Sequence, residues 1–209
     1  MCFSATASFI ASGSIGSIGL AGLREVKKSP QFALALIPVV FAVQQGIEGI
    51  IWVSTDSTCV TFVASKAYLF FAYTFWPVYI PWAVRLGETV KKRKDILFPF
   101  LIAGTLIGLY GLWLAFIAPE HPVLVNENLQ YQIPEKYYIF GILYVLAVTI
   151  PCLISTSKWI KIFGIFLFLT FLVALIFSYQ AVASVWCYYS AFASILVYFH
   201  LRAQRKKEK

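Results

Sequence analysis

The chain has 209 residues, of which 60% are hydrophobic, 18% aromatic and 12% charged, and it carries a formal net charge of +8. Charged residues make up about 25% of a typical soluble globular protein, so this composition excludes a soluble domain and indicates an integral membrane protein. The basic residues cluster between apolar segments and at the C-terminus, as topology determinants do, and this disfavours nucleic-acid binding.

Seven apolar segments can be marked along the chain, each close to the 20 or so residues that cross a hydrocarbon core about 30 Å thick. The sequence therefore predicts an all-α integral membrane protein, with one seven-helix bundle over residues 1–201 and a basic cytoplasmic tail at 202–209. The predicted helices are 4–23, 32–54, 62–84, 96–118, 137–155, 159–178 and 180–201.

The first segment, 4–23, is rich in glycine and serine. Its glycines leave little side chain on the helix surface, so we expect close packing against a neighbouring helix. Ser4, Ser8 and Ser12 recur every four residues and share one face, where they either bond to carbonyls of their own helix or line something polar. No basic stretch precedes this segment and no clear cleavage site follows it, so we expect it to be retained.

The second segment, 32–54, contains polar groups within an apolar run. Gln44, Glu48 and Trp52 lie four residues apart on one helix face, and Gln45 can point into the same quadrant of a bundle. A charged side chain near the centre of a bilayer costs about 2.5–3.5 kcal/mol on insertion scales. An ionisable residue there is by default a functional-site hypothesis, and Glu48 is the centre of the candidate site.

The third segment, 62–84, is the most aromatic of the seven, and Pro77 and Pro81 predict bends in it. Its Lys66 is a cation within an otherwise apolar helix. Counting about 1.5 Å per residue places Lys66 and Glu48 at a similar depth, roughly 8–9 Å below the outer ends of their helices. Because a short loop joins the two helices, an ion pair between Glu48 and Lys66 is geometrically easy.

The fourth segment, 96–118, contains Gly104-xxx-Gly108, a spacing that permits close helix crossing and that we interpret as packing. The connection that follows, 119–136, is polar and contains prolines. It is the only connection long enough to cap the bundle.

The last three segments differ in polarity. The segment 137–155 is apolar, and 159–178 consists almost wholly of Ile, Leu, Phe and Val, so it should face lipid on much of its circumference. The segment 180–201 instead carries a stripe of small and polar residues that should face inward. The stripe consists of Gln180, Ser184, Cys187, Ser190 and Ser194.

The lysines and arginines are distributed unevenly between the two sides of a seven-helix bundle. One side holds only Lys66 and Lys136. This asymmetry predicts an outside N-terminus and a cytoplasmic C-terminus in a multi-pass protein of the inner, cytoplasmic membrane. The fifteen on the other side are Arg24, Lys27, Lys28, Arg85, Lys91, Lys92, Arg93, Lys94, Lys158, Lys161, Arg202, Arg205, Lys206, Lys207 and Lys209.

This orientation of the helices in the membrane brings polar residues of the first, second, third and seventh segments to the outer end of the bundle. We predict a polar pocket that opens outward there. The amides and serines that converge at this depth are polar, and the small side chains among them leave space unfilled. A satisfied buried network that only fixes helix packing is the alternative interpretation. The expected ligand-binding residues are Ser4, Ser8, Gln44, Gln45, Glu48, Trp52, Lys66, Tyr73, Gln180, Ser184 and Cys187.

The cysteines and histidines narrow the chemistry. Cys2 and Cys59 fall on the outer side and can form a disulfide in an oxidising compartment. If Met1 is removed, Cys2 presents an α-amine beside its thiol, which can act as a nucleophile or bind a soft metal. The two histidines, at 121 and 200, lie at opposite ends, and no HxxxH, HExxH or CxxC occurs, so we predict neither a metal site nor a cofactor. The absence of lysine from 180–201 excludes a retinal Schiff base in its usual position.

Two stretches carry a resemblance to a known family. The opening Met1-Cys2-Phe3-Ser4-Ala5-Thr6-Ala7-Ser8-Phe9, with the later Gln44-Gln45-x-x-Glu48-Gly49-x-x-Trp52, resembles an uncharacterised family of small prokaryotic membrane proteins that begin MCFS-A-x-ASF. The resemblance implies no reaction, but it supports the choice of site residues. The positions that match the motif are Cys2, Ser4, Ser8, Gln44, Glu48 and Trp52.

These residues support three functional hypotheses. In the leading one, the pocket binds or conducts a small molecule or ion, with Glu48 as the proton or cation acceptor and Lys66 as its counter-charge. In the second, the protein is an intramembrane enzyme for a lipid or acylated substrate, with Cys2 or Cys187 as nucleophile and Glu48 as acid or base, although no histidine is placed to activate either thiol. In the third, it is a membrane sensor or assembly factor whose basic tail contacts a partner or anionic lipid.

Overall fold

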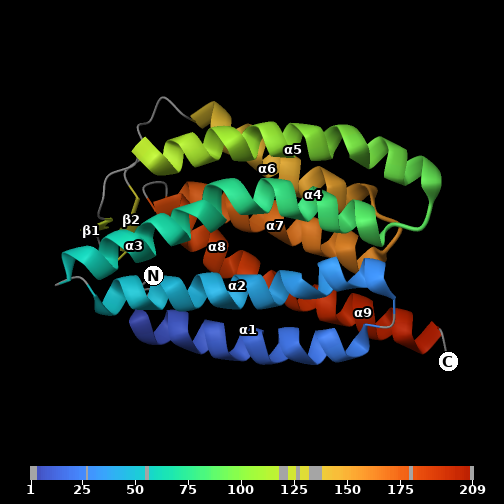
Figure 1. Ribbon diagram of the computed structural model, residues 1–209, viewed down its shortest axis with the longest axis horizontal. Helices are drawn as coiled ribbons and strands as arrows, with labels where there is room; N and C mark the ends of the chain where they lie inside the picture. Colours follow the sequence, from blue (N-terminus) through green and yellow to red (C-terminus); the bar gives the residue numbers. More distant parts are fainter. Residues whose placement is uncertain are drawn as a thin grey trace.

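In a computed structural model the chain forms a bundle of long helices that run roughly antiparallel to one another (Figure 1). The structure describes residues 4–26, 28–54, 57–117, 122–125, 128–131, 138–178 and 181–207. Within these ranges, six helical stretches are long and apolar enough to cross a membrane, and a seventh, Ile139–Ile154, is apolar but shorter. The predicted helical bundle is confirmed, apart from a short β-hairpin that the sequence did not predict, and it is compatible with an integral membrane protein.

Two of the seven segments are interrupted helices. The third runs through a π-helical turn, and the seventh breaks at Ser194, between two shorter helices. The elements are α1 (Ala5–Glu25), α2 (Ser29–Val53), α3 (Thr58–Leu69), η1 (Phe70–Phe75), α4 (Trp76–Gly87), α5 (Lys91–Ile117), β1 (Val123–Val125), β2 (Asn128–Gln130), α6 (Tyr138–Ile154), α7 (Lys158–Phe177), α8 (Val182–Ala193) and α9 (Ile195–Lys207). The basic residues from 202 to 207 continue α9.

The helices α1 and α2 pack closely because small residues line their contact. A Cβ built on Gly16 would lie 3.3 Å from the Cβ of Ala42, and one on Gly19 would lie 3.0 Å from the backbone nitrogen of Val39. The Ser12 hydroxyl crosses the interface and donates to the Ala42 carbonyl at 2.8 Å. The predicted close packing of the glycine-rich first segment is confirmed.

The helix α5 approaches the backbone of η1 and α4 directly. A Cβ on Gly104 would lie 2.0 Å from the Pro77 carbonyl oxygen, and one on Gly111 would lie 2.1 Å from the Tyr73 carbonyl oxygen. Only glycine permits this approach. The packing role predicted for Gly104-xxx-Gly108 is confirmed, and Gly111 extends it by one further turn.

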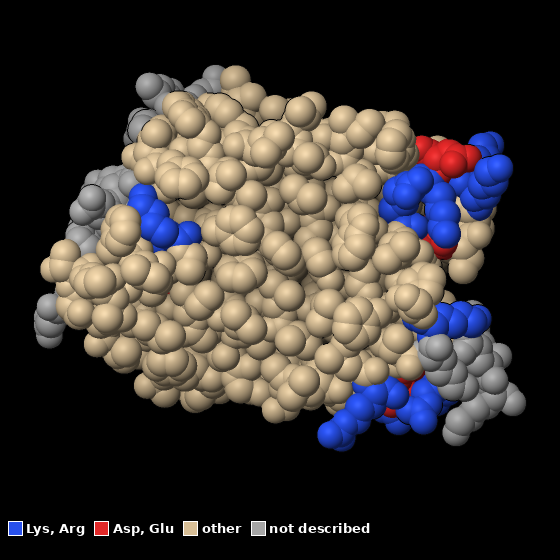
Figure 2. Space-filling model, in the orientation of Figure 1, with Lys and Arg blue, Asp and Glu red and all other residues tan. Residues whose placement is uncertain are grey.

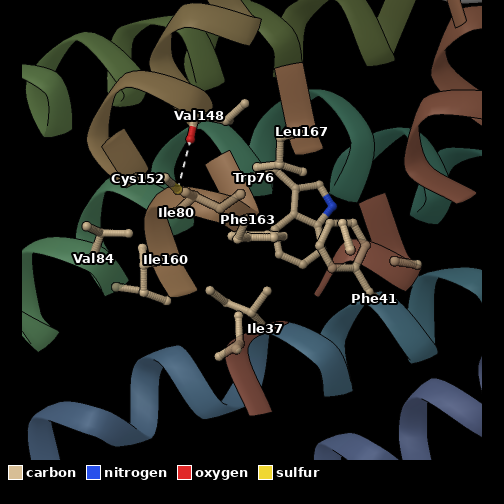
Figure 3. Close-up of a cluster of buried hydrophobic side chains, with 14 of the residues drawn as sticks. Ile37, Phe41, Trp76, Ile80, Val84, Val148, Cys152, Ile160, Phe163 and Leu167 are labelled. Carbon is tan, nitrogen blue, oxygen red and sulfur yellow. Dashed lines mark hydrogen bonds between the residues drawn. The ribbon is translucent and has the colours of Figure 1, made fainter. Parts of the chain in front are cut away.

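The core lies between α2, α4, α6, α7 and α8. Figure 3 shows its centre, where Phe41 and Trp76 stack with ring centroids 3.8 Å apart, beside Phe163 and Leu167. In the same view the Cys152 thiol donates a hydrogen bond to the Val148 carbonyl of its own helix at 3.3 Å. The predicted inward stripe of the last segment is confirmed for its described members, since Ser184, Cys187, Ser190 and Ser194 are all buried.

The ends of the bundle differ in charge. Figure 2 shows most of the lysine and arginine side chains in view gathered at one end, which is the end of the α4–α5 turn and of α9, while the face in view carries basic atoms elsewhere only near the other end. At that end Arg205 pairs with Glu25 at 2.9 Å. We refer to it as the basic end, and to the other, where α2 ends and α3 begins, as the hairpin end because β1 and β2 lie there (Figure 1).

Candidate functional site

The centre of the candidate site is Glu48, which lies five residues before the end of α2 at Val53, near the hairpin end. Its side chain is 2% exposed. The amide of Gln45, one turn earlier, donates to Oε2 at 3.3 Å, and the hydroxyl of Ser184 on α8 donates to Oε1. Tyr68 on α3 also lies beside this carboxylate, and its hydroxyl donates to the Ala183 carbonyl at 3.4 Å. Three separate segments therefore meet at Glu48.

The neighbouring amide, Gln44, links the site to the core. Trp76 Nε1 donates to Gln44 Oε1 at 2.7 Å. Cys187, on α8 one turn after Ser184, lies with its thiol beside the Gln44 amide and the Tyr68 hydroxyl. The polar groups around the Cys187 thiol are thus an amide, a phenol and the Glu48 carboxylate, and none of them is a cation that would stabilise a thiolate.

The β1–β2 hairpin covers the site at the hairpin end of the bundle. Tyr131, which follows β2, stacks on Tyr68 with ring centroids 4.9 Å apart and an interplanar angle of 9°. Leu129 is buried beside them, in one cluster with Tyr68 and Cys187. The expectation that the long connection caps the bundle is confirmed for its described part.

Several buried polar atoms around Glu48 have no hydrogen-bond partner among the residues that the structure describes. They are Gln44 Nε2, Gln45 Oε1, Trp52 Nε1 and Tyr131 Oη. Nearly all buried polar groups in proteins are hydrogen-bonded to protein or to water, because each unsatisfied one costs about 1–3 kcal/mol. Four such atoms around one carboxylate indicate a site that something else completes.

The predicted ion pair between Lys66 and Glu48 is wrong. Lys66 Nζ donates instead to the carbonyl oxygens of Ala115 at 3.0 Å and Phe116 at 3.4 Å, where its charge suits the C-terminal end of α5. The reason is rotational, since residues two apart on an α-helix point about 200° away from each other. Tyr68 faces Glu48, so Lys66 faces away from it. Residue counting predicts how deep a side chain lies along its helix, but not the direction in which it points.

The other predicted site residues are dispersed. Ser4 is exposed and accepts a hydrogen bond from the Ala7 backbone nitrogen at 3.2 Å, as the N-cap of α1. Ser8 is buried on α1, and Tyr73 is buried with its ring edge-on to Phe140. Cys2 and Gln180 lie outside the described residues, and so does the predicted disulfide between Cys2 and Cys59, although Cys59 itself is exposed.

The space beside the site is small. A void of about 10 Å³ lies against Trp76, Cys187 and Ser190, and its remaining lining is apolar. That is close to the volume that one water molecule needs. Glu48, Gln44 and Gln45 do not line this void, and its lining is almost wholly apolar, so it is a packing gap of the core. The sequence led us instead to expect a pocket open to the outside and large enough for a small molecule.

No group of three or more His, Cys, Asp or Glu side chains gathers within the described ranges. The acceptors at Glu48 are carboxylate, amide and hydroxyl oxygens, which suit hard cations.

A comparison with protein families identifies the chain, because a family of unknown function, DUF6629, matches residues 1–209. The chain belongs to DUF6629. The expectation of an uncharacterised family is confirmed, while the motif positions, Cys2 among them, stay predictions. Searches of curated proteins and of solved structures find no match.

This DUF6629 protein contains a second buried carboxylate that the sequence reading missed. Glu88, which follows α4 at the basic end, is 3% exposed. It accepts hydrogen bonds from the backbone nitrogens of Thr89 at 2.8 Å, Val90 at 3.0 Å and Thr156 at 2.7 Å, and from the Thr156 hydroxyl. Burial alone would raise the pKa of the Glu88 carboxyl, but these hydrogen bonds outweigh it and hold the pKa below its usual range.

Three aromatic residues at the site were also missed as site residues: Tyr68, Trp76 and Tyr131. A signal for Tyr68 was present, because it lies in the same aromatic segment as Lys66 and is the polar residue on the opposite face. Tyr131 had no comparable signal, since it follows a short strand in a long connection, where no helical periodicity applies.

Proposed function

We propose that this DUF6629 protein is a multi-pass protein of the inner, cytoplasmic membrane, and that it binds a small monovalent cation at Glu48. Transport of the ion and sensing of it would both begin with this binding step. The orientation proposed is N-terminus outside and C-terminus cytoplasmic, which puts the Glu48 site near the outer surface. The clustering of lysine and arginine at the basic end supports that orientation (Figure 2).

The observation that carries the proposal is an incomplete polar shell around a buried carboxylate. An ionised carboxylate in an apolar interior is strongly disfavoured unless a positive charge accompanies it. No lysine, arginine or histidine pairs with Glu48 among the described residues. Gln45 Oε1 and Tyr131 Oη are further oxygen acceptors for which the described part of the chain supplies no donor.

Charge and ligand type indicate the class of cation. Glu48 supplies one negative charge, which a monovalent ion neutralises, whereas a divalent ion would leave a net charge of +1 buried in an apolar environment. The carboxylate, amide and hydroxyl oxygens at Glu48 are hard ligands, which alkali ions prefer.

The alternative enzyme hypothesis retains one supporting observation, since Cys187 lies near Glu48. A thiol-reactive lipid probe tests it. If that probe labels the wild-type protein and not Cys187→Ser, the enzyme hypothesis gains over cation binding.

Thermal unfolding of the purified protein tests cation binding. Melting temperatures are measured in LiCl, NaCl and KCl, against N-methylglucamine chloride at the same ionic strength. We expect at least one alkali ion to raise the melting temperature in a saturable manner, because a ligand that binds only the native state stabilises it. The Glu48→Gln variant should lose this response while remaining folded.

Glu25→Gln is the matched control, because Glu25 is a carboxylate that pairs with Arg205 at the other end of the bundle. It should keep the cation response. A wild-type melting temperature that does not depend on which cation is present would contradict the proposal, and so would an unchanged response in Glu48→Gln.

A further inference from the structure

A second hollow, far from Glu48, lies at the basic end between the start of α2 and the last turns of α4. Its volume is about 380 Å³, and its lining includes Lys28, Ser29, Phe32, Trp82 and Leu86. Known small-molecule sites occupy about 300–1,000 Å³. Ser29 and Glu48 are nineteen residues apart on α2, which is roughly 30 Å along the helix, so this hollow is separate from the cation site.

The walls of the hollow are fixed by contacts between its two helices. The Tyr79 hydroxyl on α4 donates to the Ala33 carbonyl on α2 at 2.9 Å, directly behind the hollow. Trp82 packs against Tyr79 with ring centroids 5.3 Å apart. The hollow is therefore framed by the α2–α4 packing, and Val26 and Lys28 of the connection between α1 and α2 complete its lining.

Along α2 the lining of the hollow changes from polar to apolar. Lys28 and Ser29 provide a cation and a hydroxyl at the start of the helix, and Phe32 follows one turn further into the bundle. Phe32 is 50% exposed and Trp82 is 42% exposed, although both are large and apolar. A polar edge beside exposed aromatic rings matches the boundary between headgroups and acyl chains, where tryptophan concentrates in membrane proteins.

We infer that this hollow binds an anionic phospholipid, with its phosphate at Lys28 and Ser29 and the upper part of an acyl chain along Phe32 and Trp82. Charge complementarity supports an anionic lipid, because the basic side chains gather at this end (Figure 2). Juxtamembrane lysines and arginines attract anionic lipid in this way. The inference does not depend on cation binding at Glu48.

Native mass spectrometry of the purified full chain tests the inference. The protein is equilibrated with equal amounts of phosphatidylglycerol and phosphatidylcholine, and the lipids that remain bound are counted. Phosphatidylglycerol should be retained in preference. Lys28→Gln should reduce its retention about fivefold, the effect of one lysine near an anionic surface. Trp82→Ala should reduce the retention of both lipids, because it removes the acyl-chain contact.

Lys161→Gln is the matched control, since Lys161 lies on α7 at the same end and does not line the hollow. It should leave retention unchanged. The inference is overturned if Lys28→Gln retains as much phosphatidylglycerol as wild type, or if Lys161→Gln loses as much, which would indicate general attraction to a basic surface. Displacement of the lipid by soluble glycerol phosphate at equal concentration would also overturn it, because the acyl chain would then contribute nothing.

Discussion

Glu48 and Glu88 are both buried carboxylates, at 2% and 3% exposure, yet their surroundings differ completely. Glu88, at the basic end, accepts four hydrogen bonds, three of them from backbone nitrogens in two loops. Glu48, at the hairpin end, accepts from Gln45 and Ser184 and is surrounded by polar atoms without partners. Burial of a carboxylate therefore does not by itself mark a function.

The completeness of the polar shell distinguishes the two residues. The hydrogen bonds of Glu88 join the α4–α5 turn to the α6–α7 turn, and Arg93 strengthens the same junction by donating to the Ile154 carbonyl at 2.5 Å. Such a network stabilises a fold and leaves no position for a ligand. The Glu48 shell is unfinished, and a partly satisfied network is costly unless a ligand or water completes it. The following predictions test this contrast, from the largest expected effect to the smallest.

The largest effect is expected from Glu88→Ala. Three backbone nitrogens and one hydroxyl lose their acceptor, so the free energy of unfolding should fall by about 2–4 kcal/mol. Thermal and denaturant unfolding of the purified protein measure it. A loss below about 1 kcal/mol would show that water replaces the carboxylate and that the two ends do not differ in the way described.

A smaller effect is expected from acidification. Because the pKa of Glu88 is lower in the folded chain than in the unfolded one, its contribution to stability is full above the ordinary value of about 4.3 and is lost as the pH falls below it. Melting temperatures of wild type and Glu88→Gln between pH 7 and pH 3 measure this contribution. The difference between them should narrow below about pH 4, and a constant difference would contradict the prediction.

A change of less than about 1 kcal/mol in the free energy of unfolding is expected for Glu48→Gln without alkali ions, because the amide keeps the size of the side chain and removes a buried charge. At saturating cation concentration the same variant should have a lower free energy of unfolding than wild type. Unfolding measured in both media separates the two cases. A loss as large as that of Glu88→Ala without cation would make Glu48 a structural residue like Glu88.

The smallest effect is expected for Tyr131→Phe. Its hydroxyl has no hydrogen-bond partner within the described ranges, so removing it should leave the stability without cation unchanged or raise it by up to about 1 kcal/mol. If the hydroxyl contributes to the cation site, the half-saturating cation concentration should rise several-fold. Cation titrations followed by thermal unfolding measure this. Lower stability without cation would show that Tyr131 already has a hydrogen-bond partner.

Much of the fold could be predicted because apolar periodicity and length suffice to locate helices that are long and apolar. The sequence also predicted that Glu48 and Ser184 lie at the same end of the bundle, because the order and direction of the helices place both residues near that end. The position of Lys66 did not, because helix rotation is set by packing and not by residue count. Glu88 was missed because most of its partners are backbone nitrogens, two from its own turn and one from the α6–α7 turn, and a backbone donor cannot be recognised in the sequence.

The contact between α5 and the η1–α4 backbone has a consequence for how this sequence can diverge. Any side chain at Gly104 or Gly111 would overlap a carbonyl oxygen of the facing helix, whereas no atom of the described residues lies within 4 Å of a Cβ at Gly13 or Gly141. The chain therefore contains two kinds of glycine that look alike in the sequence. One kind is open to replacement, and the other restricts evolution to a single amino acid for as long as α5 crosses at this distance.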